Sequence, residues 1–134
     1  MNDIYVAARP GLPEIDFRFS QDRLALRGPS CPTSATAFYG PLGAALMAYL
    51  ARARGRRIRI EVSPVYFNGS SQRVLRGLFG MLDAAWINDN EVCVDWHYDP
   101  VEAGSRDLGL DLADEFIMLR YRMIPRSATG AVPE

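Results

Sequence analysis

The stretch Ile-Arg-Ile-Glu-Val-Ser-Pro-Val-Tyr-Phe-Asn-Gly-Ser-Ser, residues 58–71, joins a strand pattern to the start of a helix. Residues 58–63 alternate between apolar and polar side chains, which is the period of a strand with one face in a core and one toward solvent. Apolar residues then recur at helical spacing over 74–86, so a central helix is predicted to open near Ser70 or Ser71.

The two adjacent serines at this junction have two possible roles. A hydroxyl at the start of a helix can cap it by accepting a bond from a backbone N–H, which stabilises a fold by about 1 kcal/mol. The first turn also leaves backbone donors unpaired and carries about half a positive charge, so it favours a phosphate group. The junction alone favours capping and leaves phosphorylation open.

The remaining periodicity predicts five strands and three helices. The strands fall at residues 15–19, 24–26, 58–62, 92–98 and 119–123. The first two form a hairpin with its turn at Gln21-Asp22, and a helix capped by Thr33 or Ser34 begins shortly before Pro41. A short third helix covers residues 108–116 after a polar loop.

The strands are apolar on one side only, so helices are expected mainly on one face of the sheet. With right-handed crossovers between parallel strands, this order predicts an α/β fold. The predicted architecture is a two-layer sandwich with a mixed, mostly parallel sheet of about five strands.

Length and composition indicate one domain without cofactor or membrane chemistry. The 134 residues, 49% hydrophobic, predict a single domain over 1–134 with flexible ends at 1–12 and 127–134. A net charge of -1 and the lack of a leader or a long apolar run predict a cytoplasmic protein without nucleic-acid or membrane partners. Cys31 and Cys93 lie far apart and are expected as buried thiols.

No cofactor or metal site is predicted from the motifs. All 15 basic residues are arginine, which excludes lysine chemistry, and no glycine-rich phosphate or dinucleotide fingerprint is present. The arginines of residues 52–57 follow a helix, where positive charge is favoured, and are interpreted as a solvated helix end.

One residue set invites an enzymatic hypothesis. Asp95, His97 and Asp99 share one face of a strand, and with Ser70 or Ser71 they suggest a hydrolytic triad. The serines lack the strained strand-to-helix context of a nucleophile elbow. A small-ligand site or hydrolase using His97 is therefore kept only as a lesser alternative to a protein that is not an enzyme.

Five motifs between about Glu14 and about Ile124 follow one another in a familiar order. They are Ile15-Asp16-Phe17, Leu24-Ala25-Leu26-Arg27-Gly28, Phe38-Tyr39 with Pro41, Tyr66-Phe67-Asn68-Gly69-Ser70-Ser71 and Val94-Asp95-Trp96-His97-Tyr98-Asp99. Together they resemble the SiaC-type regulatory phosphoprotein family, which was long catalogued as a domain of unknown function. The family fold is similar to STAS domains and anti-sigma-factor antagonists, in agreement with the predicted architecture.

The resemblance implies a partner-switching signalling protein. In the family, a protein kinase phosphorylates the threonine of a Tyr-Phe-Asn-Thr-Ser-Ser motif, and a metal-dependent serine/threonine phosphatase reverses this. The unmodified form binds and activates a diguanylate cyclase, which connects the family to cyclic di-GMP and biofilm formation. The same partners are expected here.

This chain departs from the family motif at Gly69, which stands where the family has threonine and cannot be phosphorylated. In the related anti-sigma-factor antagonists a serine at the start of this helix is the acceptor, so Ser71, and after it Ser70, are the predicted phosphorylation sites. The predicted partner-binding residues are Tyr66, Phe67, Asn68, Gly69, Arg73 and Arg76. The alternative is a constitutive binder that has lost the switch.

Overall fold

The computed structural model describes residues 2–126, so the predicted flexible end at 127–134 lies outside the described residues. In chain order the elements are β1 (Ile4–Val6), β2 (Glu14–Arg18), η1 (Phe19–Gln21), β3 (Arg23–Ser30), α1 (Ala35–Arg52), β4 (Arg57–Phe67), α2 (Gly69–Ala84), η2 (Ala85–Asn88), β5 (Glu91–Tyr98), α3 (Ala103–Glu115) and β6 (Arg120–Pro125).

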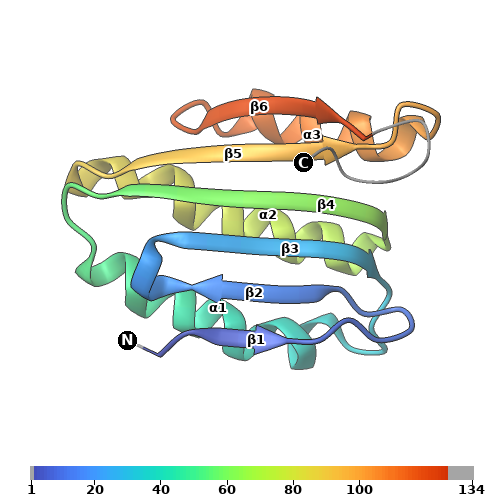
Figure 1. The fold of residues 1–134 in the computed structure, drawn as a ribbon, viewed down its shortest axis with the longest axis horizontal. Coiled ribbons are helices and arrows are strands. Elements are labelled where there is room, and N and C mark those ends of the chain that lie inside the picture. The colour runs from blue at the N-terminus through green and yellow to red at the C-terminus, as the bar shows by residue number, and fades with distance from the viewer. Residues whose placement is uncertain (1, 127–134) are drawn as a thin grey trace.

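The strands form one sheet in the order β1-β2-β3-β4-β5-β6. β1, β2 and β3 pair antiparallel, and the pairs β3–β4, β4–β5 and β5–β6 are parallel, with a helix in each crossover. All three α-helices lie behind the sheet in Figure 1, so the opposite sheet face is open. The predicted two-layer, mostly parallel α/β architecture is confirmed, with one strand more than expected.

The core lies between the sheet and the helices, where the apolar residues of each strand point. Trp96 is fully buried, and its Nε1–H donates to the carbonyl oxygen of Ser105 at 2.9 Å, which fixes the start of α3 against β5. Gly109 of α3 gives this ring room, because a Cβ at that position would lie 2.5 Å from Trp96 Nε1. A side chain larger than hydrogen therefore has no space at residue 109.

One strand was not predicted, and one helix begins earlier than predicted. Residues 4–6, expected within a flexible end, form the edge strand β1, which is too short for its periodicity to be recognised. The helix α3 begins at Ala103 rather than at Leu108, because Glu102 caps it by accepting from the Gly104 N–H at 2.9 Å. Its first turn carries no apolar stripe, which is why the sequence pattern missed it.

Three further expectations are corrected. The first predicted strand ends at Arg18, since Phe19 already belongs to η1. Ser34 does cap α1, accepting from the Ala37 N–H at 3.2 Å, but Pro41 then lies well inside the helix rather than near its start. Neither thiol is buried, because Cys31 is exposed and Cys93 is half-buried on the open sheet face.

No helix among residues 2–126 is long and apolar enough to cross a membrane.

Candidate functional site at the start of α2

Asn68, not a serine, caps α2. Its Oδ1 accepts a hydrogen bond from the Ser71 backbone N–H at 2.9 Å and another from the Ser70 hydroxyl at 3.1 Å. An asparagine in extended conformation just before the helix is among the best capping residues, and it satisfies one of the unpaired N–H groups of the first turn. The serine hydroxyls are therefore not needed for capping.

The hydroxyl of Ser71 lies in the core. Its residue is 0% exposed, and the Oγ–H donates to the carbonyl oxygen of Ser30 at 3.1 Å while the Oγ accepts from Ser30 Oγ at 2.8 Å. Ser30 Oγ in turn accepts from the Tyr39 hydroxyl at 2.6 Å, so every proton of the three hydroxyls is used. This network joins the end of β3, helix α1 and the first turn of α2.

Sequence reasoning missed Ser30 and Tyr39, because both lie more than thirty residues before Ser71. Burial raises the pKa of Tyr39, so its hydroxyl stays protonated and remains a donor at neutral pH. Nothing in the local pattern around either residue indicates a shared network. Only the packing of α1 beside α2 brings them to Ser71.

Gly69 and Ser70 form the accessible part of the same turn. Gly69 is exposed and Ser70 is half-buried, and the Ser70 hydroxyl donates to Asn68 Oδ1. A Cβ built on Gly69 would meet only Arg73 Nη1, at 3.8 Å. The guanidinium of Arg73 therefore reaches back over the first turn of α2, where the helix dipole is positive.

Arg76, the second predicted arginine, is already engaged. It forms an ion pair with Glu115 at the end of α3, which fixes α2 to its neighbour. Arg73 is exposed and has no ion pair among residues 2–126, so it is the arginine that is free to bind an added anion.

The predicted binding residues before the helix point in different directions. Tyr66 is 61% exposed at the end of β4, whereas Phe67 is 4% exposed and belongs to the core. Tyr66 and the exposed Val65 border a hollow of about 380 Å³ that continues to Gln72 of α2 and to Leu108 of α3. The site thus combines a serine hydroxyl, a free arginine and a hollow lined by both apolar and polar residues.

One protein family matches nearly the whole of this chain, including the start of α2. The model of the SiaC family regulatory phosphoproteins matches residues 6–126. The chain belongs to the SiaC family. The predicted resemblance is thereby confirmed over nearly the whole chain.

Solved SiaC structures share the fold of this family member. SiaC of Pseudomonas aeruginosa has a TM-score of 0.85 and 21% identity, covering 94% of this chain and 100% of the other. In a structure of the diguanylate cyclase SiaD with its activator SiaC from the same organism, one chain gives a TM-score of 0.85 at 19% identity, covering 92% of this chain and 100% of that one. A curated relative, an uncharacterized protein of P. aeruginosa strain UCBPP-PA14, is 24% identical over 116 residues, which are 87% of this chain and 88% of the relative.

The alternative enzymatic residues of this SiaC family member are not assembled with the serines. His97 is 7% exposed on the open sheet face, where its Nε2 lies 3.8 Å from Glu61 Oε1. Asp95 is held by Arg59 and Arg122, and Asp99 accepts from the Val101 N–H. Among the described residues no hydrogen bond joins His97 to Ser70 or Ser71, and no group of three or more His, Cys, Asp or Glu residues is placed to hold a metal ion.

Proposed function

We propose that this chain is a non-enzymatic regulatory phosphoprotein that binds a diguanylate cyclase or a similar target through the surface around the start of α2. A protein kinase phosphorylates Ser70 and a phosphatase removes the phosphate, so that binding follows the state of one hydroxyl. The observation that carries this proposal is that Ser70 in the first turn of α2 is only half-buried, beside a free arginine, whereas Ser71 is fully buried. Membership of a regulatory phosphoprotein family supports it.

Ser70 is preferred to Ser71 on accessibility. A kinase must bring the acceptor oxygen to the γ-phosphate of its nucleotide, and Ser71 Oγ is fully buried and bonded twice to Ser30. Phosphorylation of Ser71 requires the first turn of α2 to leave β3 and α1. Ser70 Oγ gives up only one hydrogen bond, to Asn68, and the Asn68 cap on the Ser71 N–H is retained.

The charge of a phosphoserine explains how the switch works. A phosphate on Ser70 carries up to two negative charges. The positive end of the α2 dipole and the guanidinium of Arg73, one turn away, stabilise this charge in the unbound protein. A partner that covers Tyr66 and the adjacent hollow must strip water from this charge. Burying it without a matching cation costs several kcal/mol, so docking is lost.

Phosphopeptide mapping of the protein isolated from its own host tests the acceptor. We expect one phosphate on the peptide that contains Ser70, lost in Ser70→Ala and retained in Ser71→Ala, provided that Ser71→Ala is shown to be folded. Phosphate on Ser71 alone would assign the switch to the buried hydroxyl instead.

Binding to a purified diguanylate cyclase tests the function. Ser70→Glu is expected to weaken binding at least tenfold, because a fixed charge enters the interface. Ala51→Glu adds the same charge to an exposed position in the last turn of α1, which lies at the other end of β4 from the start of α2, and is the matched control, expected to bind like the unmodified protein. If neither the parent protein nor the control binds any cyclase of the host, the proposed target is wrong.

Gly69 supports a second candidate, a constitutive binder without a switch. This hypothesis predicts that the protein binds the cyclase and carries no phosphate on Ser70 or Ser71. Gly69→Thr separates the two readings, because the position has room for a Cβ and lies in the first turn of a regular helix. Phosphorylation of Gly69→Thr but not of the parent protein would show that the kinase is present and that this chain has lost its acceptor.

A further inference from the structure

The open face of the sheet carries a row of arginines in register. Arg18 of β2 is paired with Arg23 of β3, and Arg23 is paired with Arg59 of β4. Cys93 follows on β5, and Arg120 stands beside it on β6. Like charges directly opposite one another on adjacent strands destabilise a sheet, so this row needs compensating anions.

The compensation within the described residues is incomplete. Arg18 is paired with Asp16 at 3.2 Å and Arg120 with Glu91 at 3.4 Å. Arg59 only shares Asp95, at 3.3 Å, because that carboxylate binds Arg122 through both of its oxygens. Arg23 stands between two other arginines and has no ion pair among residues 2–126.

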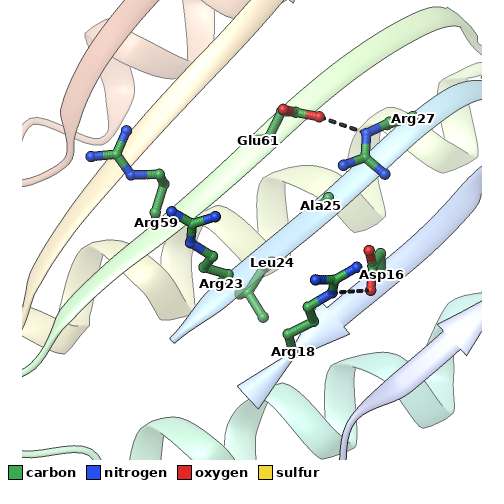
Figure 2. Close-up of a pocket in the computed structure, with 8 residues that line it drawn as sticks. All are labelled: Asp16, Arg18, Arg23, Leu24, Ala25, Arg27, Arg59 and Glu61. Carbon is green, nitrogen blue, oxygen red and sulfur yellow. Dashed lines mark hydrogen bonds and ion pairs between the residues drawn. The ribbon is translucent and has the colours of Figure 1, made fainter. Parts of the chain in front are cut away.

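A hollow lies beside this row. It has a volume of about 200 Å³, and its lining includes Ala25, whose side chain is much shorter than those of the neighbouring arginines. Figure 2 shows the side chains of Arg18, Arg23 and Arg27 around Ala25, with Glu61 beside Arg27. The lining contains four guanidinium groups, including that of Arg59, and the two carboxylates of Asp16 and Glu61. Arg27 also pairs with Glu14, and Arg59 shares Asp95 with Arg122, so Arg23 is the arginine of this lining without an ion pair among residues 2–126.

We propose that this hollow, bordered by Arg18, Arg23, Arg27 and Arg59, is a binding site for a small phosphorylated molecule. Guanidinium groups match phosphoryl oxygens with two parallel hydrogen bonds, which makes arginine the residue suited to this recognition. Asp16 and Glu61 are held by Arg18 and Arg27. Arg23 has no ion pair among residues 2–126, and Arg59 only shares the Asp95 carboxylate with Arg122, so these two guanidinium groups can bind the ligand.

The size and composition of the hollow favour a small ligand over a protein segment. Its volume exceeds that of a single phosphate ion, so it leaves room for a second phosphoryl group or for the sugar of a phosphate ester. The carboxylates of Asp16 and Glu61 can accept hydrogen bonds from sugar hydroxyls, whereas they would repel the side chains of an acidic peptide. This site is separate from the proposed switch, which lies beyond the other end of β4.

Titration calorimetry at low ionic strength tests the site, with inorganic pyrophosphate, adenosine monophosphate and a peptide of ten glutamates as separate probes. We expect the two phosphate compounds to bind. Arg23→Gln should weaken their binding by roughly tenfold or more, because a hydrogen-bonded charge is lost. Arg106→Gln removes the same charge from α3 and is the matched control, expected to bind like the parent protein.

A second variant tests the shape of the site independently of charge. Ala25→Leu keeps every arginine but fills the hollow, and we expect it to lose phosphate binding to the same extent. Thermal unfolding should show that Arg23→Gln is no less stable than the parent protein, since it relieves a row of like charges.

Three results would overturn the assignment. The first is no binding of either phosphate compound at millimolar concentration. The second is an equal loss in Arg23→Gln and Arg106→Gln, which would indicate only general charge attraction. The third is tighter binding of the glutamate peptide than of both phosphate compounds, which would make this face a docking surface for an acidic protein segment.

Discussion

At the scale of single residues, the adjacent hydroxyls of Ser70 and Ser71 have opposite environments. Ser71→Ala should lower the free energy of unfolding by about 1–3 kcal/mol, because a buried hydroxyl pair loses its bonds and Ser30 Oγ–H loses its acceptor. Ser70→Ala should change it by about 0.5 kcal/mol or less, since Asn68 still caps the helix. Urea denaturation of the two variants measures both values, and similar losses would contradict the structure.

Asp95 links stability to pH on the open sheet face. Burial by itself would raise its pKa, but the hydrogen bond and charge of Arg122, with the charge of Arg59, outweigh this and hold the pKa below its ordinary value of 3.8. A lowered pKa in the folded state stabilises the fold above pH 3.8, and this contribution is lost as the pH falls through the folded-state value.

Asp95→Asn should therefore be less stable than the parent protein at neutral pH, and the difference should shrink as the pH falls below 3.8. Urea denaturation at several pH values between neutrality and the acid transition checks this. Asp111→Asn, which changes an exposed carboxylate on α3, is the control and should follow the parent protein. A gap between Asp95→Asn and the parent that widens toward acid would reverse the assigned sign.

At the scale of elements, helices α3 and α2 each contain a glycine, one in crowded and one in open surroundings. Gly109 of α3 lies against the Trp96 ring, so Gly109→Ala should lower the free energy of unfolding by about 1–3 kcal/mol through overpacking. Gly77 of α2 faces open space, and Gly77→Ala should raise it by about 0.5–1 kcal/mol by removing the flexibility of glycine inside a helix. Thermal or urea unfolding distinguishes these opposite signs, and a loss in both variants would show that α2 is more crowded at Gly77 than the structure indicates.

At the scale of the whole molecule, the two proposed sites lie at opposite ends of β4. Arg59 borders the arginine-lined hollow, and Asn68 caps α2 nine residues later, a span of about 30 Å along an extended strand. Arg23→Gln should therefore leave cyclase binding unchanged, and Ser70→Glu should leave pyrophosphate binding unchanged. The double variant should show the sum of the two separate effects within about 0.5 kcal/mol, as measured by calorimetry with each ligand. A larger departure would show that the sheet couples the sites.

The periodicity of the apolar residues was sufficient to predict the two layers, because it shows which face of each element is buried. The strand period is found in residues 15–19 and 58–63, and the helical period in residues 74–86. The periodicity could not predict β1, which is too short to show a pattern and forms by pairing with β2. It also could not predict the first turn of α3, which depends on the Glu102 cap and has no apolar pattern. The family motif located the start of α2, and its residue types were enough to nominate Ser70 and Ser71.

By itself, the sequence determined the fold class, the covered face of the sheet and the turn that carries the proposed switch, since these depend on local periodicity and on short motifs. The accessible serine, the free arginine and the meeting of arginines from three strands follow from tertiary packing alone. The physical reason is that burial and charge pairing depend on residues distant in the chain. Ser30 and Tyr39 form the hydrogen-bond network around Ser71, and Glu115 forms the ion pair with Arg76. The strand register places Arg23 between two other arginines.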